Sequence, residues 1–159
     1  MKSLLILPLV AVLAAGCSRQ DTSGQGAAPP GQGARSGAAP DREGLQGTWK
    51  FLSMGGSGKA RPPEFIADMR VTISGRQYAL TKGGKVLEQA TLTADPSQEP
   101  KAIDLAFTQG EAKGQTALAI YEITGGTLRI AWSEPGKARP TEFANRAGLR
   151  QDLWELRRE

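Results

Sequence analysis

The stretch Met69-Arg70-Val71-Thr72-Ile73-Ser74 decides the fold class, because its apolar and polar residues alternate strictly. A period of two is typical of a β-strand with one buried face. Ser74-Gly75-Arg76 then carries a turn signal, and Tyr78 and Leu80 resume the alternation. The pattern predicts that the chain doubles back here as an antiparallel hairpin.

Similar runs continue from Gly47 to the carboxyl end, separated by turn signals about 8–15 residues apart. Gly-Gly pairs at 83–84 and 125–126 favour tight hairpins, and the prolines at 62 and 63 favour one short helix over residues 62–68. Eight strands in near-sequential hairpins predict an all-β, antiparallel up-and-down barrel, whose closure removes exposed edges. The residues expected in strands are 49–53, 69–74, 78–80, 86–94, 103–107, 115–124, 128–132 and 152–158.

The run 115–124 has two candidate inward faces, and the choice decides what fills the barrel. One face carries Tyr121 with alanines at 117 and 119, which would leave room for a cavity. The other face carries Leu118 and Ile120, which would fill it. Both outcomes suit a small eight-stranded barrel, which is either filled by side chains or holds one small ligand.

The amino end reads as a targeting segment rather than as part of the barrel. Residues 1–16 combine Lys2 with an apolar run from Leu4 to Ala15, which is too short to span a bilayer and typical of a secretory signal. Ala14-Ala15-Gly16-Cys17 resembles a bacterial lipobox, so we expect Cys17 to be acylated and to anchor the chain in a membrane. Residues 17–40, rich in Gly, Ala and Pro, are expected to be a disordered tether, and residues 41–159 the folded domain.

Composition excludes several classes of function. The 159 residues include no His and one Cys, which excludes Ser-His-Asp triads, His metal ligands and multi-Cys zinc sites. Asp104, Glu122 and Glu142 are the only acids in motif-like surroundings, and Asp104 should point outward because it alternates with apolar neighbours. We therefore expect a protein that is not an enzyme, with no catalytic residues, no cofactor and no metal. Three of the 20 basic and one of the 16 acidic residues precede Asp41, so the domain carries a net charge of +2. This small positive charge does not indicate binding to nucleic acid.

Two loops invite functional interpretations. Residues 55–59, Gly-Gly-Ser-Gly-Lys, lack the spacing of a phosphate-binding loop, and Ala60 stands where Ser or Thr should follow, so we expect a flexible inter-strand loop. Residues 135–143 form a Pro-bounded loop that we place at the barrel mouth. There Lys137 and Arg139 could receive an anionic group, or the loop could be rigid, with Phe143 plugging the barrel end and the charges solvated.

Gly47-Thr48-Trp49 opens the first strand, in which Trp49, Phe51 and Ser53 alternate with Lys50 and Leu52, and it resembles the G-x-W signature of lipocalin-type barrels. The resemblance implies a lipocalin-like barrel in which a basic residue of the last strand stacks on the Trp. Arg158 is the candidate, because it shares a predicted face with the other inward residues of that strand, and Arg157 is the alternative.

The domain also resembles an uncharacterised lipocalin-like family expanded in planctomycete bacteria. That resemblance implies a small, often exported domain and carries no established activity or catalytic residues. The matching stretches are Leu45-Gln46-Gly47-Thr48-Trp49-Lys50, Pro100-Lys101-Ala102-Ile103-Asp104-Leu105, Ile120-Tyr121-Glu122-Ile123 and Pro135-Gly136-Lys137-Ala138-Arg139-Pro140-Thr141-Glu142-Phe143.

Together these observations lead to two hypotheses. The first is a lipoprotein of the cell envelope, anchored in the outer membrane and facing the periplasm, whose barrel binds a small apolar or amphipathic ligand. Its candidate ligand contacts are Tyr121, Trp132, Lys137 and Arg139. The alternative is a filled barrel that acts through its surface on another envelope protein, as an inhibitor or assembly factor, with no small-molecule ligand.

Overall fold

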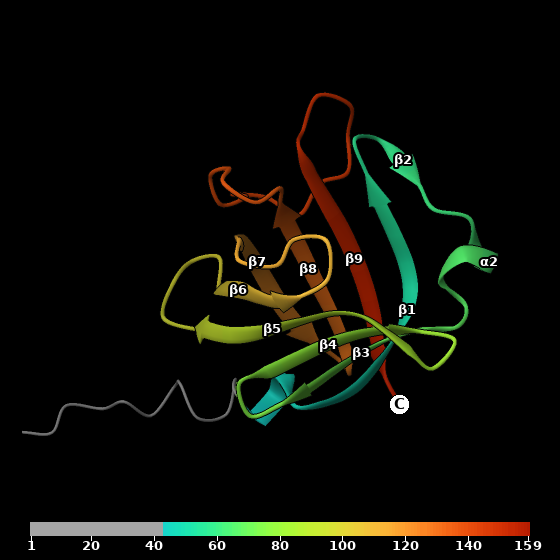
Figure 1. The fold of residues 1–159 in the computed structure, drawn as a ribbon. Helices are drawn as coiled ribbons and strands as arrows, with labels where there is room; N and C mark the ends of the chain where they lie inside the picture. The colour runs from blue at the N-terminus through green and yellow to red at the C-terminus, as the bar shows by residue number, and fades with distance from the viewer. Residues whose placement is uncertain (1–42) are drawn as a thin grey trace, which may run out of the picture. The chain divides into compact units, whose positions relative to one another are not determined.

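Eight antiparallel strands close into a barrel in the computed structural model, which describes residues 43–159 (Figure 1). A ninth, two-residue strand pairs with the last two residues of the first, and a four-residue helix follows it. The elements, in chain order, are β1 (Gly47–Gly56), β2 (Lys59–Ala60), α2 (Pro63–Ile66), β3 (Met69–Ser74), β4 (Gln77–Lys82), β5 (Lys85–Asp95), β6 (Ala102–Gln109), β7 (Thr116–Thr124), β8 (Thr127–Ser133) and β9 (Gln151–Arg158).

The predicted up-and-down barrel is confirmed, since every strand from β3 to β9 pairs with the strand before it in the barrel. The barrel closes where β9 pairs with β1, from Trp49 opposite Arg158 to Gly56 opposite Asp152. In Figure 1, β9 accordingly lies between β8 and β1. Cys17 and the tether lie outside the described residues.

The loop expected at residues 55–59 is instead a tight hairpin. β1 continues to Gly56, and Gly56 pairs with Lys59 of β2 across the two turn residues Ser57 and Gly58. Both turn residues have positive φ, 52° and 79°, as this type of hairpin turn requires. The hairpin is also bound from outside, because the Gly58 amide donates to Asn145 Oδ1 over 2.8 Å.

The expected alternation of β1 is wrong beyond Phe51. The pairing with β9 shifts between Phe51 and Ser53, which makes Leu52 an extra, exposed residue in a β-bulge. As a result, Met54 takes the buried position and Ser53 faces outward, where its hydroxyl donates to Glu155. Inserting one residue reverses the faces of all that follow it.

The inward face of β7 carries Tyr121, with Ala117 and Ala119, so this strand presents its two small residues to the interior. Ile120 is also buried, but it points outward, in a row with Ala102 and Ala131 on the neighbouring strands. Aliphatic and aromatic side chains thus pack the interior of the barrel at the Trp49 end. Towards the other end, β7 contributes only the small side chain of Ala117.

Trp49 closes one end of the barrel. Its ring is fully buried, and its Nε1 donates to the Leu45 carbonyl over 2.9 Å. The guanidinium carbon of Arg158, the residue named for this role, lies 4.4 Å from the ring centroid, and the guanidinium also donates to the carbonyls of Gln46 and Gly44. Gly47 has φ 114°, and a Cβ there would lie 3.2 Å from Arg158 Nη1, so the first residue of the signature leaves room for the stacked cation.

Residues 134–150, which we call the strap, join β8 to β9 and lie against the outer wall of the barrel. Ser133 donates to the Ala138 carbonyl at the start of the strap, and Gln151 donates to the carbonyls of Glu142 and Ala144 at its end. Phe143 does not plug the barrel: its ring lies 5.2 Å from the guanidinium of Arg129, which points outward from β8.

Candidate functional site: a cavity at the open end of the barrel

A cavity of about 250 Å³ opens at the end of the barrel opposite Trp49. Its wall consists of residues from six strands, and its mouth is formed by the β1–β2 turn, the β6–β7 loop and both ends of the strap. The residues that line it are Ser57, Tyr78, Glu88, Leu105, Phe107, Ala112, Ala117, Trp132, Ser133, Glu134, Pro135, Arg150, Gln151, Asp152 and Trp154.

Aromatic rings form much of the wall. Trp132 lies between Tyr78 and Trp154, with ring centroids 6.4 Å and 5.6 Å away, and Trp154 packs in turn on Phe51 at 5.2 Å. Successive rings are inclined by 60° to 65°, so they bend around the interior instead of stacking. Ala117 lies in the same wall, and its small side chain leaves the space that a leucine or valine would occupy.

Three polar atoms of this wall have no hydrogen-bond partner within residues 43–159: Tyr78 OH, Trp132 Nε1 and Trp154 Nε1. Tyr78 is 2% exposed and Trp132 is 7% exposed, so bulk water does not satisfy them. A buried donor without a partner costs about 1–3 kcal/mol. Trp49 at the closed end shows the contrast, since its indole nitrogen is bonded to a carbonyl. These three atoms are enclosed by the surrounding protein, so a molecule in the cavity reaches them only when neighbouring side chains of the wall move.

Two carboxylates also face the cavity, Glu88 from β5 and Asp152 from β9. Burial raises the pKa of Glu88, and the charge of Glu111 raises it further. Burial also raises the pKa of Asp152; Arg61 opposes this shift and Glu134 adds to it. Neither carboxylate has a salt-bridge partner among the described residues.

Glycines make room for both carboxylates. A Cβ on Gly56 would lie 1.8 Å from Asp152 Oδ1, and a Cβ on Gly110 would lie 2.9 Å from Glu88 Cγ. Gly110 also has φ 101°, a backbone conformation that side chains rarely adopt. The positions of the two acids therefore depend on the absence of a side chain beneath each of them.

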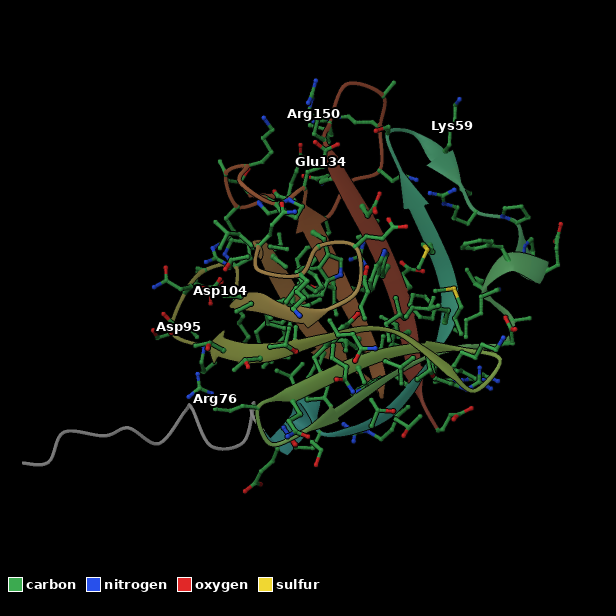
Figure 2. The ribbon with its side chains drawn as sticks, viewed as in Figure 1. Lys59, Arg76, Asp95, Asp104, Glu134 and Arg150 are labelled. Carbon is green, nitrogen blue, oxygen red and sulfur yellow. The ribbon has the colours of Figure 1, made fainter. Side chains whose placement is uncertain are left out.

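The mouth carries one further charged pair. Glu134, after β8, and Arg150, before β9, approach to 3.6 Å, and both side chains are more than half exposed. Figure 2 shows the two residues together at this end of the barrel. An exposed pair of this kind adds little stability, about 0–1 kcal/mol, but it neutralises Glu134 at the rim.

Of the four residues expected to contact a ligand, the structure brings one to the cavity. Trp132 lines it, whereas Tyr121 lies deeper, in the packed core. Lys137 is exposed on the strap. Arg139 turns to the outer wall, where it donates to Asp104 over 2.6 Å and to the carbonyls of Ile103 and Ala119 over 3.0 and 2.7 Å. Asp104 points outward, as predicted, and Figure 2 shows it on β6 away from the mouth.

Sequence reasoning missed Glu88, Asp152 and the cavity role of Trp154. The signal was present, because Glu88 has the same strand parity as the buried Ala90, and Asp152 the same parity as Trp154 and the buried Leu156. Because alternate residues of a strand share a face, a charged residue at a position of the apolar face is expected to point into the barrel.

Comparison of the chain with protein-family models, curated proteins and solved structures found no match. Within residues 43–159, no three acidic or thiol side chains are grouped as a metal site would require. In the same part of the chain, no helix is long and apolar enough to cross a bilayer.

Proposed function

We propose that this protein is a non-enzymatic binding protein of the cell envelope whose lipocalin-like barrel holds a small amphipathic ligand in the cavity at its open end. The observation that carries the proposal is the wall itself: inclined aromatic rings that include three buried, unpartnered donors. Apolar pockets with a few convergent polar groups are the usual form of small-molecule sites.

The size of the cavity limits the ligand. At about 250 Å³ it falls just below the range of about 300–1,000 Å³ typical of sites for drug-sized molecules. A ligand that is fully enclosed is therefore small, and a larger one leaves part of its body outside the mouth. The three donors favour a ligand that carries at least one oxygen or nitrogen acceptor.

The envelope location rests on the sequence of the amino end. Acylation of Cys17 would anchor the chain, and residues 18–40 would let the barrel stand clear of the membrane. Ser18 after the acylated Cys favours the outer membrane by resemblance to bacterial sorting rules. In this arrangement the barrel faces the periplasm. The family we infer is the planctomycete-expanded lipocalin-like one, on the stretches it shares with this chain.

Native mass spectrometry of the full-length protein, extracted from envelopes in mild detergent, tests the binding function. We expect a discrete added mass that is lost on denaturation and is reduced or absent in an Ala117→Leu variant, whose larger side chain occupies part of the cavity. A bare mass in both samples, together with a stoichiometric protein partner in the extract, would replace the proposal with the surface-acting, filled-barrel alternative.

Fractionation of cells tests the anchor separately. The unmodified chain should sediment with outer membranes, and a Cys17→Ala variant should appear in the soluble periplasmic fraction. Equal distribution of the two chains would contradict lipid anchoring and would leave the binding proposal untouched.

A further inference from the structure

We propose that the ligand of this cavity is an organic cation, a small amine or quaternary ammonium that also carries a hydrogen-bond acceptor. The inference rests on the proposed binding function and specifies the chemical class of its ligand. Three features of the cavity carry it: its charge, its aromatic rings and its unpaired donors.

The charge of the wall is negative. The charged residues that line the cavity are Glu88, Glu134, Asp152 and Arg150, and Arg150 is paired with Glu134. Glu88 and Asp152 remain, and no lysine or arginine forms a salt bridge with either within the described residues. Arg61 already acts on Asp152 electrostatically, so Glu88 is the acid that a bound cation would newly provide with an opposite charge, whereas a bound anion would meet two like charges.

The aromatic rings of the cavity also lack a cation, and this separates them from other rings of the molecule. Outside the cavity, Lys82 lies 4.6 Å from the Phe65 centroid, and Arg158 and Arg129 lie over Trp49 and Phe143. No side chain of residues 43–159 lies in this way over any of the four rings that line the cavity, which are Tyr78, Phe107, Trp132 and Trp154. Several aromatic rings around a pocket are the usual site for an organic ammonium group.

The unpaired donors narrow the class further. Indole N–H groups donate and cannot accept, so an acceptor on the ligand is the group that would satisfy the enclosed nitrogens of Trp132 and Trp154. A bare alkylammonium ion has none, whereas an amino alcohol or an amino ether has one close to its charge. Glu88 and Tyr78 both belong to the lining of the cavity, and the Tyr78 hydroxyl has no hydrogen-bond partner among the described residues.

A matched pair of probes tests the charge assignment. Choline and 3,3-dimethylbutan-1-ol have the same shape and hydroxyl group and differ in a positively charged nitrogen against a neutral carbon. Their dissociation constants for the full-length protein in detergent are measured by titration calorimetry, after removal of any retained ligand. We expect choline to bind at least about tenfold more tightly.

Isosteric variants locate the effect. Glu88→Gln and Asp152→Asn should each reduce the preference for choline several-fold and leave the affinity for the neutral alcohol nearly unchanged. Glu64→Gln, an exposed acid on α2, is the matched control and should retain the full preference. The comparison of probes on the unmodified protein requires no variant, so it stands even where a substitution impairs folding.

The remaining outcomes separate this inference from the proposed function. Equal affinity for the two probes, tighter binding of the alcohol, or a preference for choline that survives both substitutions would overturn the cation assignment while the cavity remained a binding site. Failure of both probes to bind also overturns the assignment. Joined with a bare native mass, that failure would overturn the proposed function as well.

Discussion

Replacing alanine with leucine at two inward positions of β7 should change the free energy of unfolding in opposite directions. Ala117 lines the cavity and Ala119, two residues further along the same face, is fully buried in the packed core. In Ala117→Leu, the new carbons enter existing space and gain about 0.8 kcal/mol each from burial, so the upper limit of stabilisation is about 2.4 kcal/mol. We expect a neutral to stabilising change within that limit.

Ala119→Leu has no such space. Ala119 faces Ile103 on β6 and Trp132 on β8, and its side chain is 0% exposed. Extra methylenes in a filled core force neighbours from their rotamers and cost about 1–3 kcal/mol. The two variants should therefore differ in free energy of unfolding by at least about 1 kcal/mol and by as much as about 5 kcal/mol.

Urea denaturation followed by intrinsic fluorescence measures both variants against the unmodified protein. Ala117→Leu should in addition lose the ligand or probe that the unmodified protein binds, and Ala119→Leu should keep it if it remains folded. If Ala117→Leu were destabilised as strongly as Ala119→Leu, the open end of the barrel would be filled, and the reasoning from the cavity would fail.

Three further predictions concern charges. Arg158→Met should cost about 1–3 kcal/mol in urea, because it removes the cation over the closed-end Trp and two charged donors, whereas Arg157→Met should stay within about 0.5 kcal/mol; equal costs would contradict the stacking role. Because burial raises the pKa of Glu88 and Asp152, the folded state binds these protons more tightly than the unfolded chain, so their contribution to stability falls as pH rises from the ordinary carboxyl range through the raised values. A Glu88→Gln/Asp152→Asn double variant should lack this slope in urea midpoints measured against pH, and an unchanged slope would assign it to other groups. Arg139→Met should speed hydrogen exchange in the strap without changing the affinity of the protein for choline. A loss of that affinity would show that Arg139 contributes to the ligand site after all.

The barrel could be predicted because its strands have one buried and one wet face. Residues such as Val71, Ile73 and Leu105 alternate with polar neighbours, and hairpin glycines separate the runs. The bulge at Leu52 could not be predicted in this way. Both Ser53 and Met54 are acceptable continuations of a strand, and only the pairing with β9 selects between them.

The course of the strap depended on contacts that are distant in sequence. Arg139 lies 35 residues from Asp104 and 20 from the Ala119 carbonyl, and these partners draw its guanidinium to the outer wall. No local pattern indicates this. We expected Arg139 at the mouth because its loop joins two strands there. Only the two ends of the loop lie at the mouth, and Arg139 lies further along it.

The sequence could not decide whether the barrel holds a cavity, and the reason is physical. Alternation shows which residues face inward, but the space between them depends on side-chain volumes summed across strands that are not neighbours in sequence. The alanines of β7 marked one wall, and Trp132 another. The contribution of Glu88 and Asp152 was visible only as a charge at an inward position, which a search for apolar alternation passes over.

The three indole N–H signals of ¹⁵N-tryptophan-labelled protein test the central claim most directly. The Trp49 nitrogen is bonded to a carbonyl at the closed end, while Trp132 and Trp154 line the cavity and their indole nitrogens have no partner among the described residues. Addition of choline or of 3,3-dimethylbutan-1-ol should shift the Trp132 and Trp154 signals and leave that of Trp49 in place. If neither probe moved those two signals, or if Trp49 alone responded, the open-end cavity would not be the binding site.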